Sequence, residues 1–237
     1  MELSIIIVNY NTKDLILKCI ESIKKSKPKV SYEIIVIDNG SEEPPPSSKD
    51  YRLIKNKENL GFAKANNQGI RLAKGEYVLL LNSDTEVKKG SIDKLYEFAK
   101  AKRDVGVVAP RLLNPDGSVQ GSVFLTPTIW RNIRQYFFGE EKLLTKYAPD
   151  GESPQNVEIV STAAFMITPA ALKKVGFLSE KYFMFFEEFD YCRRVKEKGL
   201  KIVYFPTSEI IHYHGASGEK LAAPKDQWRR LIPSSKI

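Results

Sequence analysis

An apolar run that ends abruptly in polar residues, YVLLLNSDTE from Tyr77 to Glu86, constrains the fold more than any other segment. A short aliphatic run bounded by turn formers is typical of a strand buried on both faces, as in a parallel sheet. Asp84 then sits at the strand's carboxyl end, where open α/β sheets bind ligands. A carboxylate there is suited to hold a divalent cation against a diphosphate, although the same residues also form plain turns.

The first hundred residues alternate between strand and helix patterns. Strands are expected at 4–9, 33–37, 52–55, 77–82 and 105–109, and helices at 12–23, 62–73 and around 92–98. This alternation predicts right-handed βαβ units with a parallel sheet. Asn9, Asp38 and Asp84 then lie at the same sheet edge. We also expect Thr12 to cap the first helix.

The second half of the chain is less regular. A strong turn signal at 114–117, flanked by short apolar segments, predicts a hairpin. Further on we expect a strand at 157–167, a short helix at 169–175, an amphipathic helix at 187–198 and a strand at 201–205. No internal repeat or domain linker interrupts the pattern, so we expect a single domain.

Composition narrows the class of protein. The chain has 237 residues, 42% of them hydrophobic, which is enough for a substantial core. A formal charge of +8 suits an anionic ligand or surface, although lysines that only confer solubility are the commoner explanation. Basic residues are scattered rather than striped along one helix, so we expect no nucleic-acid partner.

The cysteines and the amino terminus bear on the compartment. Cys19 and Cys192 lack CxxC spacing and fall in helical patterns, which predicts reduced, buried thiols. The amino terminus, MELSIIIVNYN, has no basic region before its apolar run, and that run has the length of a strand. We therefore expect neither a signal peptide nor a membrane span, and a cytoplasmic location.

Four segments taken together are more specific than any one of them. VIDNGS (36–41), NLGFAKANNQG (59–69), LLLNSDT (79–85) and FMFFEEFDYCRR (183–194) occur in an order and spacing that resemble the inverting family 2 glycosyltransferases. The chain is most similar to the rhamnosyltransferase-like branch. The resemblance spans residues 3 to about 215 and includes PRLLNPDGSVQ (110–120) and HYHGAS (212–217).

The resemblance implies an α/β GT-A fold, with a Rossmann-like, mostly parallel sheet flanked by helices and a smaller acceptor-side region. Residues 1–109 would form the nucleotide-sugar-binding half, and residues 110–237 the acceptor-binding and catalytic-base half. The implied donor is a dTDP- or UDP-sugar, with rhamnose as the first choice. The implied acceptor is a hydroxyl of a glycan or lipid-linked molecule in cell-surface polysaccharide synthesis.

The resemblance also assigns donor contacts. Asp38 matches the acidic residue that hydrogen-bonds the donor's base, which suits a pyrimidine imide N–H, although an Asx-turn explains it equally well. The other donor-side positions follow from the same motifs, and taken singly they are ordinary polar loops or helix faces: Asn9, Tyr10, Asn11, Asn39, Gly61, Phe62, Asn66, Asn67, Asn82, Ser83 and Arg193.

Two residues match the family's metal ligands. Asp84 matches the last acid of the DxD motif, whose first acid is replaced here by Asn82. His212 matches a downstream histidine that completes the coordination of a divalent cation, Mn²⁺ or Mg²⁺, and imidazole favours Mn²⁺. A surface or supporting role for His212 stays open. His214 has no assigned role.

The inverting reaction needs a general base near the acceptor hydroxyl. The family's Glu-Asp pair corresponds to Glu187 and Glu188, so Glu188 is the expected base, with one methylene more than the usual aspartate. Asp190 and Arg193 would orient the site or contact the diphosphate. The alternative is that these acids only stabilise the amino terminus of a helix through its dipole.

Other functions fit these residues less well. A DxDxT phosphatase needs an aspartate nucleophile where Asn82 stands, and the glycine-rich loops of dinucleotide and P-loop enzymes are absent. A catalytically weakened nucleotide-sugar or glycan binding module of the same fold remains the serious alternative.

An aromatic and basic patch follows residue 128. Ile129, Ile133, Tyr136 and Phe137 recur at helical spacing beside Trp130, Arg131 and Arg134. This pattern fits a helix that makes peripheral contact with the cytoplasmic face of a membrane or grips a lipid-linked diphosphate. A helix packed on the domain's own core is the other interpretation.

Overall fold

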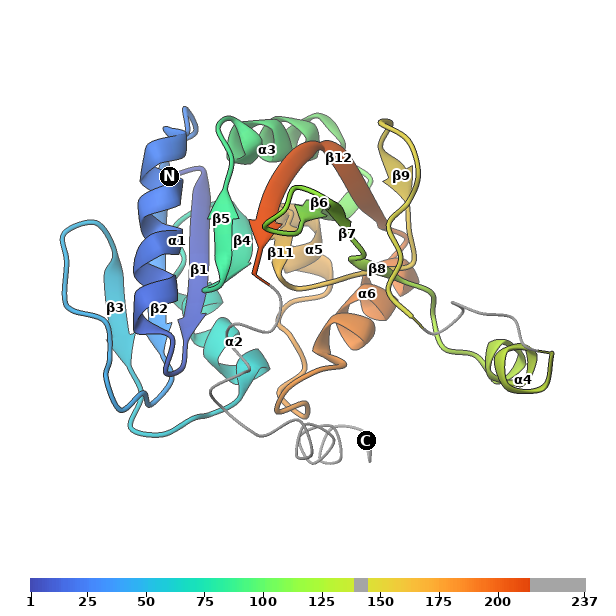
Figure 1. Ribbon diagram of the computed structural model, residues 1–237, viewed down its shortest axis with the longest axis horizontal. Helices are drawn as coiled ribbons and strands as arrows, with labels where there is room; N and C mark the ends of the chain where they lie inside the picture. The colour runs from blue at the N-terminus through green and yellow to red at the C-terminus, as the bar shows by residue number, and fades with distance from the viewer. Residues whose placement is uncertain (139–144, 214–237) are drawn as a thin grey trace.

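The computed structural model describes residues 1–138 and 145–213. Figure 1 shows a central sheet with helices on both of its faces. The sheet has ten strands in the order β3-β2-β1-β4-β11-β6-β12-β5, with β7 paired to β6 and β9 paired to β12. The predicted α/β fold is confirmed.

The amino-terminal half follows the predicted βαβ order. β1 (Leu3–Asn9) pairs in parallel with both β2 (Tyr32–Asp38) and β4 (Tyr77–Asn82), and β2 pairs in parallel with β3 (Arg52–Lys55). The register places Asn9 opposite Asp38. The predicted meeting of strand ends at one sheet edge is therefore confirmed.

Two apolar clusters bury the faces of the sheet. α1 (Lys13–Ser26) and α3 (Ser91–Ala101) contribute to the cluster on one face. α2 (Phe62–Leu72), α5 (Pro169–Lys174) and α6 (Glu187–Glu197) contribute to the other. Strand side chains alternate between the two clusters, which is why the strands of the parallel half are apolar on both faces.

The carboxyl-terminal half makes the sheet mixed. β11 (Ala164–Ile167) inserts antiparallel between β4 and β6 (Val105–Leu113). β12 (Lys201–His212) runs parallel to β6 and antiparallel to β5 (Thr85–Val87), with an irregularity between Phe205 and Glu209. β12 extends seven residues past the predicted end at 205, and this extension carries His212 to β5.

Three short strands and a hairpin complete the sheets. The predicted hairpin is confirmed by antiparallel pairing of β6 with β7 (Val119–Gln120). The predicted strand at 157–167 is wrong in extent, because it divides into β10 (Ile159–Val160) and β11. β10 pairs with β8 (Val123–Phe124) in a separate sheet, and β9 (Gln155–Asn156) joins β12.

The predicted cap at Thr12 is also wrong. Thr12 precedes α1, but its side chain makes no capping hydrogen bond. Its hydroxyl instead contacts Asn9 Oδ1 at 2.9 Å and Ser83 Oγ at 3.0 Å. The residue therefore links two loops at the sheet edge and does not satisfy the helix amino terminus.

α4 (Ile129–Phe138) lies on an arm that extends away from the sheet, at the right of Figure 1. The interpretation in which this helix covers the domain's core is therefore wrong. Ile129 and Trp130 are 78% and 74% exposed. Arg131 pairs with both carboxylate oxygens of Glu158, at 2.7 and 2.8 Å, which ties the base of the arm to the segment before β10.

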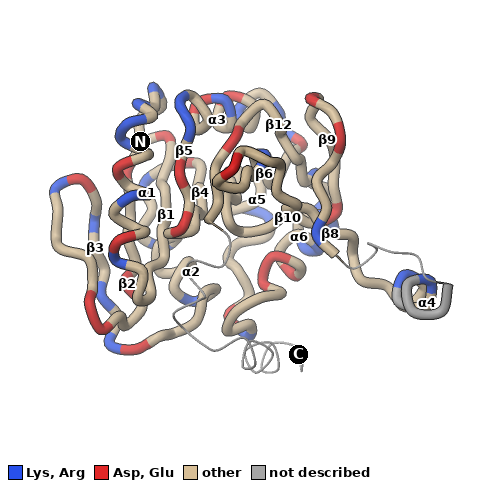
Figure 2. Tube along the Cα trace, in the orientation of Figure 1, with Lys and Arg blue, Asp and Glu red and all other residues tan. Residues whose placement is uncertain are grey.

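Both cysteines are buried free thiols, as predicted. Figure 2 shows Lys and Arg interspersed with Asp and Glu over many elements. In residues 1–138 and 145–213, no helix has the length and apolar character that a membrane crossing requires.

Candidate active site

Polar side chains converge where β1, β2 and β4 end. Asn9 and Asp38 are nearly fully buried, and Asn9 Nδ2 donates to Asp38 Oδ1 at 2.7 Å. Asn9 Nδ2 also lies 3.0 Å from Ser41 Oγ, which accepts from the backbone N–H of Asn11. An ionised carboxylate has about four acceptor positions, so Asp38 retains capacity for a ligand N–H.

The loop that follows β1 has a left-handed backbone conformation at Asn11. Asn11 has a φ of 56°, and its side-chain oxygen accepts from the backbone N–H of Glu42 at 2.9 Å. Asparagine tolerates this left-handed region better than most residues. Tyr10 beside it is half-buried. The loop after β1 is thus fastened to the loop after β2.

Asn39 holds the segment that leads into α2. Its Oδ1 accepts from Asn56 Nδ2 at 3.0 Å and from the backbone N–H of Leu60 at 3.1 Å. Its Nδ2 donates to Asn59 Oδ1 at 2.8 Å. The Asn39 amide is therefore committed to contacts with the loop that leads into α2.

Gly61 allows close contact between α2 and the loop before α6. It has a φ of 86°, and a Cβ there would lie 2.6 Å from the carbonyl oxygen of Phe183. The same carbonyl accepts from the backbone N–H of Phe62 at 2.7 Å. Glycine is needed because any side chain would separate these two segments.

In the part of the chain that the structure describes, the side-chain hydrogen bonds of Asn66 and Asn67 run to segments other than the polar cluster at the sheet edge. Asn66 Nδ2 donates to the carbonyl of Phe62, within its own helix. Asn67 is fully buried and exchanges hydrogen bonds with the backbone of Leu178, at 2.9 and 3.0 Å. Asn67 therefore anchors the loop that precedes α6.

Asp84 and His212 meet at the end of β12. The register pairs His212 with Thr85 of β5, and His212 Nε2 lies 3.4 Å from Asp84 Oδ1. Both side chains are buried. Ser83 lies beside them, linked to Thr12, while Asn82 is half-buried and donates its backbone N–H to the carbonyl of Ala163.

These two residues fit a divalent cation as a partial ligand set. A carboxylate and an imidazole are ligands that Mn²⁺ accepts, and their polar atoms are close together. The described residues contain no group of three or more His, Cys, Asp and Glu side chains arranged for a metal. The remaining ligands would have to come from a bound diphosphate. His214 lies outside the described residues.

Sequence reasoning missed Gln120 as part of this cluster. Its Oε1 lies 2.7 Å from His212 Nδ1, and its Nε2 donates to the carbonyl oxygen of His212 at 3.2 Å. Gln120 ends the motif PRLLNPDGSVQ, which indicated a family resemblance and a turn but no contact with His212. The hairpin register could have pointed to it, because β7 pairs with the end of β6 that lies beside β12.

Glu187 and Glu188 open α6 from a strained turn. Phe185 and Phe186 both have left-handed backbones, with φ of 67° and 68°. Such residues persist only where surrounding contacts determine them, and they cluster at functional sites. Both glutamates are more than nine-tenths buried, and one oxygen of each, Oε2, has no hydrogen-bond partner.

Burial sets the protonation of this pair. It raises the pKa of Glu187 well above the ordinary value, and the neighbouring charge of Glu188 raises it further. Burial also raises the pKa of Glu188, but backbone hydrogen bonds and the charge of Lys146 oppose that shift. Of the two, only Glu188 has a nearby cation, Lys146, that favours its ionised form.

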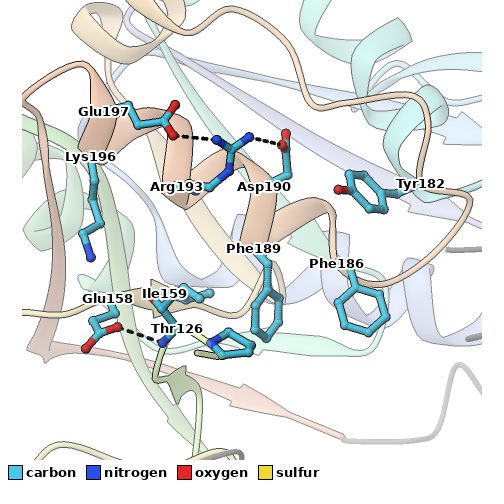
Figure 3. A pocket seen from close by; sticks show the side chains of 11 residues that line it. Thr126, Glu158, Ile159, Tyr182, Phe186, Phe189, Asp190, Arg193, Lys196 and Glu197 are labelled. Carbon is cyan, nitrogen blue, oxygen red and sulfur yellow. Dashed lines mark hydrogen bonds and ion pairs between the residues drawn. The ribbon is translucent and has the colours of Figure 1, made fainter. Parts of the chain in front are cut away.

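Asp190 and Arg193 lie on the wall of a separate pocket. Arg193 pairs with Asp190 at 3.1 Å and with Glu197 at 2.5 Å, and Arg194 Nε pairs with Asp190 Oδ2 at 2.7 Å. In Figure 3 the Arg193 guanidinium lies between Asp190 and Glu197. This ion-pair network lies on α6, whereas the polar cluster lies at the ends of β1, β2 and β4.

The pocket has a volume of about 520 Å³. Aromatic rings and charged groups share its lining: Thr126, Pro127, Glu158, Ile159, Tyr182, Phe186, Phe189, Asp190, Arg193, Lys196 and Glu197. Figure 3 shows Phe186 and Phe189 side by side, and their ring centroids are 5.7 Å apart. Since Phe186 directly precedes Glu187, the pocket begins next to the buried glutamate pair.

Comparison with known proteins establishes the family. The model of Glycosyl transferase family 2 matches residues 4–176. The chain therefore belongs to glycosyltransferase family 2, as the four sequence segments indicated.

Two curated relatives are similar over most of this chain. The low-salt glycan biosynthesis hexosyltransferase Agl10 of Haloferax volcanii is 29% identical over 221 residues, covering 89% of this chain and 67% of that protein. An N-acetylglucosaminyl-diphospho-decaprenol L-rhamnosyltransferase of Mycobacterium tuberculosis is 27% identical over 206 residues, covering 78% and 67%. The chain thus spans about two thirds of the length of these relatives.

Solved structures confirm the GT-A fold. GalNAc-T7, crystallised with UDP, GalNAc and Mn²⁺, matches with a TM-score of 0.68 at 17% identity, over 90% of this chain and 44% of that one. S. aureus TarS 1-349 in complex with UDP matches with a TM-score of 0.60 at 16% identity, over 98% and 64%. At these identities the likeness shows the fold alone.

Proposed function

We propose that this chain transfers a sugar, with rhamnose as the first candidate, from a nucleoside-diphosphate donor to a hydroxyl of a glycan or lipid-linked acceptor, with inversion. The observation that carries the proposal is the approach of Asp84 and His212 at the sheet edge that also holds Asn9 and Asp38. The product would enter cell-surface polysaccharide, in line with the glycan-building roles in the relatives' names.

On the donor side, Asp38 accepts a hydrogen bond from the imide N–H of a uracil or thymine base. Asn9 orients that carboxylate through its 2.7 Å hydrogen bond. The donor's diphosphate then extends toward Ser83 and Asp84. Asp84 and His212 would hold Mn²⁺ or Mg²⁺, which when bound neutralises the diphosphate charge that grows as the sugar leaves.

On the acceptor side, Glu188 takes the proton of the attacking hydroxyl. The acceptor oxygen forms its bond to the anomeric carbon as the bond from that carbon to the diphosphate oxygen breaks. A carboxylate base is more efficient when its pKa lies near the operating pH, and a raised pKa moves a glutamate in that direction. Burial and the charge of Glu188 raise the pKa of Glu187, which favours its protonated form and suits a role in orienting Glu188 over one as the base.

The pocket beside α6 fits the acceptor. Ring faces of Phe186 and Phe189 offer an apolar surface, and the Asp190, Arg193 and Glu197 network offers hydrogen-bond donors and acceptors. Binding sites for small polar molecules combine such surfaces with a few polar groups. The position of Arg193 favours an acceptor contact over the diphosphate contact expected from sequence.

The arm that carries α4 fits a lipid-linked acceptor. Its exposed Ile129 and Trp130 suit peripheral contact with a membrane surface, where tryptophan is favoured. In this proposal residues 1–109 contribute the donor contacts and residues 110–237 contribute the base. Both parts belong to one domain built on a shared sheet.

The first experiment is a thermal-shift panel of nucleoside diphosphates and nucleotide sugars, with Mn²⁺ or Mg²⁺, followed by a nucleoside-diphosphate release assay. A ligand that binds the folded state raises its melting temperature by mass action. A selective shift with uridine or thymidine diphosphate, together with product release, supports the transferase. Binding without release would support the catalytically weakened binding module.

A further inference from the structure

The hairpin between β6 and β7 fixes the side chain of Gln120 against His212. The chain turns at residues 114–117, where the backbone N–H of Gly117 donates to the carbonyl of Asn114 at 2.9 Å. Side chains of this turn form a continuous series of hydrogen bonds that ends on the imidazole of His212. The donor and the acceptor in each of these hydrogen bonds can be assigned from the chemical groups involved, starting at Asp116.

An ionised Asp116 can only accept hydrogen bonds. Its Oδ1 accepts from the backbone N–H of Ser118 at 2.9 Å and from the Ser118 hydroxyl at 2.6 Å, and these bonds lower the pKa of Asp116. The only hydroxyl hydrogen of Ser118 is therefore used. The contact at 2.9 Å between Ser118 Oγ and the Asn114 amide must then be donated by Asn114 Nδ2.

The donor role of Asn114 Nδ2 fixes the orientations of the Asn114 and Gln120 side-chain amides. Asn114 directs Oδ1 toward Gln120, whose Nε2 donates to it at 2.7 Å. Gln120 Nε2 also donates to the carbonyl oxygen of His212 at 3.2 Å. Because an amide nitrogen is the donor group of Gln120, two acceptors on that side leave Oε1 facing His212.

The tautomer of His212 follows. Gln120 Oε1 is an acceptor and lies 2.7 Å from His212 Nδ1, so Nδ1 carries the hydrogen. In a neutral imidazole the other nitrogen, Nε2, then presents its lone pair. Nε2 is the atom that faces Asp84 Oδ1 at 3.4 Å, a separation longer than a charge-assisted hydrogen bond of about 2.7–2.9 Å.

We propose that Gln120, held by the series from Asp116 through Ser118 and Asn114, is a positioning residue that keeps His212 in the Nδ1–H tautomer with Nε2 as a cation ligand beside Asp84. The proposal rests on the cation site of the proposed function. It gives the NPDGSVQ hairpin a task beyond chain reversal. Metal-bound histidines commonly donate their second ring nitrogen to such a partner, and loss of the partner typically weakens metal binding by about 10- to 100-fold.

The tautomer can be read directly by ¹⁵N NMR of histidine-labelled protein at alkaline pH. The chain has two histidines, so His214→Ala serves as the background in which the remaining signal is His212. We expect the Nδ1–H tautomer in this background. Gln120→Leu should shift His212 toward a mixture of tautomers, whereas Gln120→Glu, which keeps an acceptor, should retain Nδ1–H.

Metal binding is the second measurement. Titration of Mn²⁺ in the presence of UDP, followed by the electron paramagnetic resonance of free Mn²⁺, should show roughly 10- to 100-fold weaker binding for Gln120→Leu. Gln155→Leu is the matched control, because Gln155 lies on β9 and bonds the backbone of Asp150. It should bind Mn²⁺ like the parent. Thermal melting checks that each variant is folded.

An Nε2–H tautomer in the parent would overturn the proposal, as would Gln120→Leu with unchanged tautomer and unchanged Mn²⁺ binding. Failure of the proposed function looks different. If Asp84→Asn also binds Mn²⁺ with UDP like the parent, the cation site itself is wrong, and the tautomer measurement still decides whether Gln120 sets the imidazole.

Discussion

His212 Nε2 lies 3.4 Å from Asp84 Oδ1, although Asp84 stands in the turn between β4 and β5 and His212 ends β12, far along the chain. The antiparallel pairing of β12 with β5 creates this contact, since it places His212 opposite Thr85. A cation site at this edge thus depends on both halves of the chain.

Asp84→Asn should abolish cation-dependent donor binding, because the carboxylate supplies the negative charge that holds the cation. His212→Ala should weaken that binding or shift the preference from Mn²⁺ toward Mg²⁺. Isothermal calorimetry with UDP and each cation measures both effects. His212→Ala binding donor and Mn²⁺ like the parent would remove His212 as a ligand.

Asp38→Ala should weaken nucleoside binding equally with and without the cation, since the proposed contact of Asp38 is with the base and not with the diphosphate. The cost should be about 1.5–3 kcal/mol, the range for a hydrogen bond to a charged group. Calorimetry with uridine and UDP tests this. Asp93→Ala, a change of the same kind on α3, is the control. An effect that appears only with the cation would move Asp38 to the diphosphate.

Glu188→Gln should lower kcat by roughly 100-fold or more while donor affinity stays near the parent value, because the amide cannot accept the acceptor's proton. Glu97→Gln, at an exposed position of α3, is the matched control. Steady-state transfer assays measure kcat, and calorimetry measures donor binding.

The pH profile gives an independent check on Glu188. Burial raises its pKa, so the acid limb of kcat/KM should lie above the value for an ordinary glutamate. If Glu188→Gln keeps its turnover, or keeps the same acid limb, another residue is the base.

Glu187→Gln should raise the melting temperature at neutral pH. Burial and Glu188 raise the folded-state pKa of Glu187 above its unfolded value, so the folded state binds the proton more tightly. The stability that Glu187 contributes by binding this proton is fully present below about pH 4.3, and it is lost as the pH rises through the folded-state pKa. The gain from the amide should therefore vanish in acid, as melting curves across pH will show. A gain that is the same at every pH would indicate a packing effect.

Ile129→Ser with Trp130→Ser should reduce co-sedimentation with anionic vesicles and leave donor hydrolysis nearly unchanged, because both side chains are exposed on the α4 arm. Phe177→Ser, at another exposed aromatic position, is the control. Arg131 is a poor probe, since its pairing with Glu158 holds the arm in place. Parent protein that ignores anionic vesicles would favour a non-membrane acceptor.

Much of the polar cluster at the sheet edge could be predicted from the sequence. Apolar runs that stop at Asn9, Asp38 and Asn82 define parallel strands, and parallel strands direct their carboxyl ends to one edge. The place of these polar residues therefore followed from local pattern and strand direction. Free, buried cysteines and the hairpin at 114–117 followed from local signals in the same way.

Other features depended on pairings between distant segments. The antiparallel insertion of β11, the extension of β12 to His212, and the contact of Gln120 with that imidazole have no local signature. The same holds for Asn67, whose amide anchors a distant loop. The sequence alone determined which residue types stand at strand ends, because backbone preference and side-chain alternation act over a few residues. Only the tertiary structure decided which of them meet, because strand register and hydrogen-bond direction depend on partners that lie far away along the chain.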